Sequence, residues 1–164
     1  MPSRLRRSFE EGHRPKFLVV IDETAECSRA VRFAARRVLR LQNAVLLMIS
    51  VTDPPDGQHW LGVGDIMREE ADARANALME AFVWDSKSLG PMEVERVLRS
   101  GKKAEEIVKL INEDVDISFL VLASGTGSEG PGPLVSRLAA RGDFPIPVVV
   151  VPGALSDAEI DAIA

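Results

Sequence analysis

Residues 17–22 of the chain read Phe17-Leu18-Val19-Val20-Ile21-Asp22. Consecutive apolar residues closed by an acid predict a short strand that is buried on both faces of a sheet. After a polar turn, apolar side chains between Ala30 and Leu39 recur on one helical face, while arginines occupy the opposite face. A second apolar run over 44–51 completes a βαβ unit, so the two strands are expected to be parallel.

The rest of the chain continues this alternation. Prolines and glycines predict a long loop over 52–64, and Asp65 is the expected N-cap of a long helix that Leu89-Gly90-Pro91 ends. Valines mixed with charged residues predict a partly exposed edge strand over 92–98. The remaining expected elements are a helix over 104–111, a strand over 117–123, a glycine-rich loop over 124–133, a helix over 134–141, a strand over 147–151 and helical turns within 157–164. The pattern predicts one α/β domain with an open, mostly parallel sheet and helices on both faces.

Composition narrows the class of protein. The 164 residues are 46% hydrophobic and 27% charged, with a net charge of -5, which is typical of a globular domain and argues against a dedicated nucleic-acid binder. No apolar run reaches membrane-spanning length, no secretory signal is present, and the single cysteine, Cys27, suits a reducing compartment. We therefore expect a cytoplasmic protein without a membrane partner. Basic residues gather in 1–16, which predicts a mobile tail.

The candidate site follows from sheet geometry, because ligands of open parallel sheets bind at the carboxyl ends of the strands. Asp22 ends the first strand, Asp53 follows the second, and a loop with many glycines follows the fourth. Successive backbone amide groups in such a loop form an anion-binding concavity, so a phosphate is the expected ligand. The alternative is a flexible connection that needs its glycines only for turns.

Several nearby residues allow two interpretations. Asp22 is expected either to bind a sugar hydroxyl or amide, or to cap the following helix. His59 and Trp60 are expected to cover a bound ring or to pack the loop onto the domain. Cys27 is interpreted as a small buried thiol, and Glu129 would repel a phosphate if it turned inward. Neither a metal site nor a catalytic triad is indicated by the spacing of histidines, cysteines and carboxylates.

These residues together resemble the universal stress protein family from about Phe17 to Pro152. The opening run to Asp22 is similar to the family's first strand and turn, and Gly101 before an Ala-Glu-Glu-Ile helix is similar to its third strand and next helix. The segment 117–127 matches its fourth strand and nucleotide loop, and 145–152 its closing strand. Glu23 stands where the family usually has glycine.

The resemblance implies a five-stranded sheet of order 3-2-1-4-5, of the adenine-nucleotide α-hydrolase-like type, and a homodimer paired through the last strand, Pro147 to Val151. It divides the chain into a basic tail (1–16), a stress-protein domain (17–152) and a C-terminal tail with a short helix (153–164). One branch of the family binds ATP through Gly, two residues, Gly, nine residues and Gly-Ser/Thr. Here Gly127 and Gly130 match the first spacing, but Gly132-Pro133 is the nearest later anchor.

The sequence thus favours a cytoplasmic, non-catalytic stress-response module that binds ATP, another adenine nucleotide or another phosphate ligand. The alternatives are a ligand-independent dimeric interaction module and, third, a slow nucleotide hydrolase. The expected binding residues are Asp22, Thr24, Asp53, Gly125, Gly127, Ser128, Gly130 and Gly132.

Overall fold

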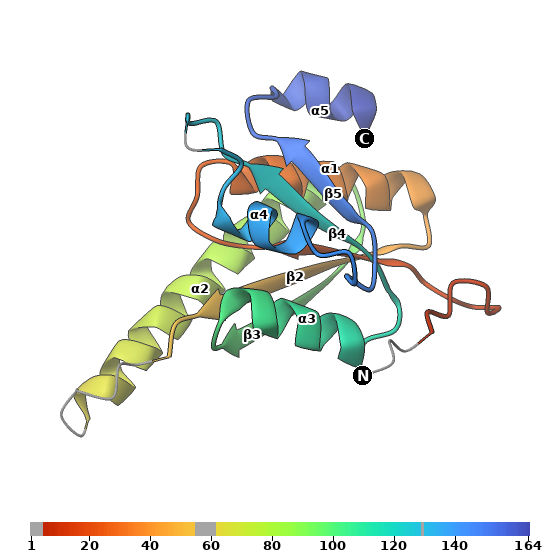
Figure 1. Cartoon of the computed structure of the whole chain (residues 1–164). Coiled ribbons are helices and arrows are strands. Elements are labelled where there is room, and N and C mark those ends of the chain that lie inside the picture. The colour runs from red at the N-terminus through yellow and green to blue at the C-terminus, as the bar shows by residue number, and fades with distance from the viewer. Residues whose placement is uncertain (1–4, 55–61, 129) are drawn as a thin grey trace.

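A computed structural model describes residues 5–54, 62–128 and 130–164. Strands and helices alternate along the chain, as Figure 1 shows. The elements are β1 (Lys16–Val20), α1 (Cys27–Leu41), β2 (Val45–Thr52), α2 (Val63–Ser88), β3 (Glu93–Ser100), α3 (Lys103–Glu113), β4 (Ile117–Ser124), α4 (Pro133–Ala139), β5 (Val148–Pro152) and α5 (Asp157–Ile163).

The five strands form one sheet in the order β3-β2-β1-β4-β5, and every neighbouring pair is parallel. The expected strand order and α/β class are therefore confirmed. β1 lies at the centre, where Leu18 is opposite Leu47 of β2 and Leu120 of β4. β3 is an edge strand, as its charged residues predicted. This order places the carboxyl ends of β1 and β4 side by side at the middle of the sheet.

The core consists of two apolar layers, one on each face of the sheet. On one face, α1 and α2 contribute Val31, Ala34 and Met79, which pack against Val19 of β1. On the other face, α3 and α4 contribute side chains such as Ile107 and Leu138, which are fully buried. The separate layers follow from strand alternation, because successive side chains of β1 point to opposite faces. α5 lies outermost, over α1 (Figure 1).

The start of α2 differs from expectation. The helix begins at Val63, with Gly62 at positive φ before it, so Asp65 lies in its first turn and the N-cap prediction was wrong. Gly62 ends the preceding loop because its φ of 99° is accessible to glycine at little cost. Asp65 still suits the helix N-terminus, where a negative charge is favoured by the dipole. The first turns of α2 extend beyond the sheet (Figure 1).

Basic residues near the N-terminus lie against the amino edge of the sheet. Arg6 Nη1 donates a hydrogen bond to the Asp114 carbonyl at 2.9 Å, and Arg7 Nη2 donates to the Asp116 carboxylate at 3.0 Å. Lys16 Nζ donates to the Asp114 carboxylate at 2.8 Å. The mobility of this tail and the three-part division of the chain stay predictions. In the part of the chain that the structure describes, no helix is long and apolar enough to span a membrane.

Candidate functional site

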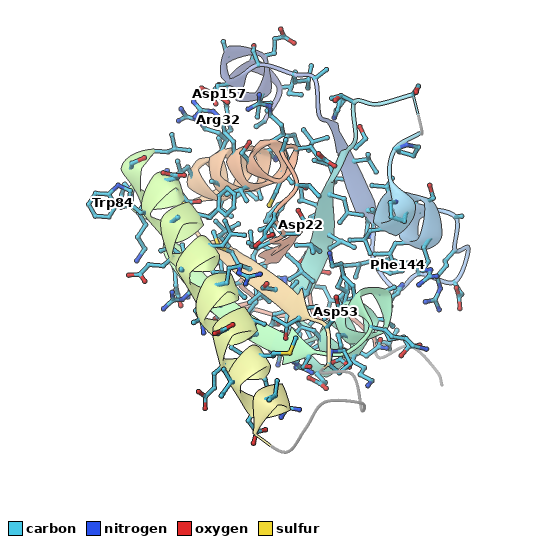
Figure 2. All side chains as sticks on the ribbon, turned by 90° about the vertical axis from the view of Figure 1, so that its left-hand side faces the viewer. Asp22, Arg32, Asp53, Trp84, Phe144 and Asp157 are labelled. Carbon is cyan, nitrogen blue, oxygen red and sulfur yellow. The ribbon has the colours of Figure 1, made fainter. Side chains whose placement is uncertain are left out.

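Asp22 lies two residues after the end of the central strand and near the middle of the molecule (Figure 2). Its Oδ1 accepts hydrogen bonds from the Thr24 amide, at 3.0 Å, and from the Thr24 hydroxyl. The N-cap of α1 is Glu26, which makes no capping bond through its side chain. The carboxylate of Asp22 therefore fixes its own turn and does not cap α1, so that alternative was wrong.

Lys103 supplies the cation next to this carboxylate. Its Nζ lies 3.8 Å from Asp22 Oδ2, and both side chains are partly exposed, at 39% and 25%. Lys103 is the first residue of α3, so the crossover after β3 brings it to the carboxyl end of β1. Sequence reasoning missed this residue, although its position two residues after Gly101 and at the start of a helix was a usable signal.

A hollow of about 140 Å³ opens beside these two side chains. It lies between the ends of β1 and β4 and the starts of α1, α3 and α4. Its walls are mainly apolar, and Asp22, Glu26 and Lys103 carry its charges. The lining residues are Val20, Asp22, Thr24, Glu26, Cys27, Ala30, Lys103, Leu122, Ala123, Pro131, Gly132, Pro133, Leu134 and Val135.

Cys27 lines this hollow and is a buried free thiol, as predicted. Its Sγ donates a weak hydrogen bond to the Val20 carbonyl at 3.5 Å. Burial raises the pKa of the Cys27 thiol to about 12, because the thiolate would lose its hydration. The thiol is therefore neutral near pH 7 and contributes apolar surface to the hollow.

The glycine-rich loop closes on itself above the hollow. The Gly125 amide donates to the Pro131 carbonyl at 2.9 Å, so this amide is already used within the loop. Gly132, with φ of 108°, turns the chain into α4, and it is the member of the predicted loop set that lines the hollow. The lining does not include Gly125, Gly127, Ser128 or Gly130.

Asp53 belongs to a second hollow, of about 290 Å³, on the other side of Asp22. This hollow lies between the ends of β1 and β2 and the face of α2, and Figure 2 shows Asp53 near the end of β2. The lining residues are Ile21, Asp22, Glu23, Ser50, Val51, Thr52, Asp53, Ala71, Arg74, Ala75 and Leu78. Asp22 thus borders both hollows, which makes them adjacent compartments at one sheet edge.

Gly153, the residue after β5, packs against the start of the glycine-rich loop that follows β4. A Cβ at Gly153 would lie within 3.0 Å of the Ser124 carbonyl oxygen and 3.1 Å from Glu26 Cβ. Only glycine allows the chain after β5 to approach the end of β4 this closely. The C-terminal segment therefore packs directly on the loop and on the first turn of α1.

Three residues discussed from the sequence, His59, Trp60 and Glu129, lie outside the described residues. Within the described ranges, no group of three histidine, cysteine or acidic side chains is arranged to hold a metal ion. The charges at the two hollows are thus those of carboxylates, of Lys103 and of Arg74.

The fold and this edge define an open α/β protein with its candidate ligand site at the carboxyl ends of the central strands. The chain belongs to the universal stress protein family, whose model matches residues 13–152. A comparison with curated proteins gives no match.

Solved structures of the same fold include the universal stress protein UspA from Lactobacillus plantarum, at 18% identity and a TM-score of 0.72, covering 86% of this chain and 99% of that one. A universal stress protein in complex with cAMP has 18% identity and a TM-score of 0.62, with 87% and 100% of the chains covered. A family protein from Arabidopsis thaliana with AMP bound has 17% identity and a TM-score of 0.58, with 84% and 91% covered. At these identities the likeness shows the fold alone.

Proposed function

We propose that this chain is a non-catalytic stress-response protein that binds an adenine nucleotide across Asp22. The observation that carries the proposal is the pair of hollows that share this residue. Ligand pockets usually measure about 300–1,000 Å³. Neither hollow reaches that range alone, and Asp22 lines both of them, so the proposed ligand has two halves that lie on either side of this residue.

The chemistry of each hollow suits one half of a nucleotide. Near Lys103 and Gly132, a cation and a glycine backbone favour a phosphate. Around Asp53, apolar side chains such as Val51 and Leu78 favour a flat base, and carboxylate oxygens accept hydrogen bonds from an exocyclic amine. Asp22 lies between them, where its oxygens accept hydrogen bonds from ribose hydroxyls. The family structures that hold cAMP and AMP support adenine as the base.

A monophosphate suits this site better than ATP. Pro133 has no amide hydrogen, and the Gly125 amide already donates to Pro131, so neither position supplies an amide donor to a triphosphate chain. Glu26 adds a negative charge at the same hollow. We therefore expect AMP or cAMP to bind more tightly than ATP.

The test is titration calorimetry with AMP, cAMP and ATP, together with native mass spectrometry of freshly purified protein. Lys103→Met should weaken AMP binding by about 10- to 100-fold, since a hydrogen bond to a charged group contributes roughly 1.5–3 kcal/mol. Lys102→Met is the matched control, because Lys102 is the preceding residue, is 78% exposed and pairs with Glu105. If none of the three nucleotides binds, or if both lysine variants behave alike, the proposal fails.

We also propose that two copies of the chain pair through β5. This strand hydrogen-bonds to β4 on one side and has no strand partner on its other side among the described residues. Val150 is 38% exposed there, and an apolar free edge favours pairing with a second chain. The expected mass by light scattering is that of a dimer, and Val150→Lys should yield the monomer. A monomeric wild-type protein would exclude this pairing.

A further inference from the structure

The outward face of α1 carries a row of arginines. Their spacing of three or four residues places them on one side of the helix, beneath α5. From the sequence this face would be solvated, but Figure 2 shows Arg32 next to Asp157 where α1 and α5 meet. The four arginines that contact α5, called here the arginine face, are Arg29, Arg32, Arg36 and Arg40.

Asp161 of α5 makes the closest contacts with this face. Arg32 donates to its carboxylate through Nε at 2.8 Å and Nη2 at 2.7 Å, and Arg36 donates through Nε at 2.9 Å and Nη2 at 3.1 Å. Arg40 Nη2 donates to the Asp161 carbonyl at 3.1 Å. Bidentate hydrogen bonds of this kind recognise a carboxylate by its geometry as well as by its charge. Hydrogen bonds from Arg32 and Arg36 hold the pKa of Asp161 well below its ordinary value.

One helical turn earlier, Asp157 repeats the contact. Its carboxylate lies 3.3 Å from Arg29 Nη1 and 3.7 Å from Arg32 Nη1. Between the two aspartates, Ile160 is fully buried and packs into the core layer under α1. The arginine face thus accepts a specific pattern, in which two acids one turn apart flank an apolar anchor.

The cover that α5 provides is short and partly exposed to solvent. The helix has seven residues, and helices this short are marginal without tertiary contacts. Asp157 remains 60% exposed, and ion pairs in solvent contribute little to stability. α5 also lies outside the residues that match the family model, 13–152. Beside Asp161 a hollow of about 380 Å³ remains, lined by Arg36, Leu39, Arg40 and Asp161, so α5 does not use the whole face.

We propose that the arginine face of α1 is a docking surface for an acidic amphipathic helix of a partner protein, and that α5 is its built-in competitor. The partner helix presents two acidic residues one turn apart and an apolar residue between them, as α5 does. A partner that makes the same contacts and also fills the hollow at Arg40 displaces α5. The surface is separate from the proposed nucleotide site, so the two proposals can fail independently.

The test uses the full-length chain with α5 released. Ile160→Asp places a charge where a fully buried side chain packs, so α5 should leave α1 while the arginines stay unchanged. A synthetic peptide with the sequence of residues 153–164 is then titrated into the ¹⁵N-labelled protein. The amide resonances of α1 should shift, with a Kd at least tenfold lower than for the wild-type chain, whose own α5 competes at millimolar effective concentration.

Two matched controls define the recognition. Arg36→Glu in the released chain should abolish binding, whereas Arg37→Glu should not, because Arg37 forms no ion pair with α5 in the described structure. A peptide with asparagine at both aspartate positions should not bind. If Ile160→Asp loses the resonances of the folded sheet, Asp161→Arg replaces it, since it sets like charge against Arg32 and Arg36.

The outcomes are distinct. Absence of α1 shifts in a folded, released chain overturns the proposal. Equal binding of a scrambled peptide of the same composition also overturns it, because the face would then be a general anion surface. A wild-type chain that forms dimers by exchanging α5 shows that the face serves a second copy and excludes a partner protein.

Discussion

Gly153→Ala tests whether the chain after β5 lies so close to the end of β4 that one added methyl group does not fit. The steric strain at this position is to be distinguished from the effect that replacing any glycine has on the unfolded chain. In Gly153→Ala the new Cβ would lie within 3.0 Å of the Ser124 carbonyl oxygen, 3.1 Å from Glu26 Cβ and 3.3 Å from Thr126 Cγ2. The first of these neighbours is backbone at the end of β4 and cannot rotate away. The methyl group therefore fits only if the end of β5 moves away from β4.

The size of the effect follows from this overlap. Overpacking costs about 1–3 kcal/mol, while a replaced glycine regains roughly 0.4–1 kcal/mol through the unfolded chain. We expect a net loss of about 1–2 kcal/mol in the free energy of unfolding, or a fall of roughly 2–8 °C in Tm for a domain of this size. Because Ser124 and Glu26 border the glycine loop and the first hollow, AMP affinity should fall as well.

The assay is urea unfolding followed by circular dichroism, with Gly142→Ala as the matched control. A Cβ at Gly142 meets no atom within 4 Å, so this variant should be unchanged or slightly stabilised. Equal unfolding midpoints for the two variants would refute the reasoning, since they would mean that the end of β5 does not press on Ser124.

Three further outcomes are expected. At pH 8 the Cys27 thiol of the native protein should react with a disulfide reagent at least 100-fold more slowly than that of the protein unfolded in urea. The reason is that burial raises the pKa of the thiol to about 12 and leaves little thiolate. Equal reaction rates would show that the thiol is accessible. α5 should stay docked as the pH falls to about 4 and should detach only below pH 3.8, the ordinary pKa of an aspartate such as Asp161. A carboxyl whose pKa is lowered in the folded state stabilises that state above its ordinary pKa, and this contribution is lost as the pH falls further. Loss of hydrogen-exchange protection at the Ile160 amide between pH 7 and 5 would contradict this. Leu120→Ala, at a fully buried position of β4, should cost about 2–5 kcal/mol by thermal unfolding, and a cost below about 1 kcal/mol would mean that the two core layers are loosely packed there.

Much of the fold was predictable because each buried strand carries its own signal. β1, β2 and β4 are mainly apolar, with Ser50 and Ser118 as the polar residues inside their apolar runs, and the charges of β3 mark an edge. Strand order was different, since it came from the family resemblance and not from any local pattern. The start of α2 was misplaced because Asp65 satisfies the N-cap preference. The helix begins two residues earlier, at Val63, and the sequence alone does not define helix ends this closely.

The site was predictable only where it follows strands directly. Asp22 and Asp53 follow the ends of β1 and β2, so sheet geometry places both at one edge, where Asp22 lines both hollows and Asp53 lines the second. Lys103 was missed because a lysine at a helix start has the appearance of an ordinary surface charge. The arginines of α1 were placed only on the face opposite its apolar side, since nothing local to α1 shows that Asp161, more than a hundred residues later, covers them.

The position of β1 at the centre of the sheet has a consequence for synthesis of the chain. β1 and β2 leave the ribosome early, but the other edge of β1 is paired only by β4, where Leu18 meets Leu120. Until that later strand emerges, the nascent chain carries an unpaired, fully apolar edge, which is the kind of surface that aggregates or binds chaperones. Expression of fragments that end before β4 should therefore give insoluble protein, whatever the stability of the finished domain.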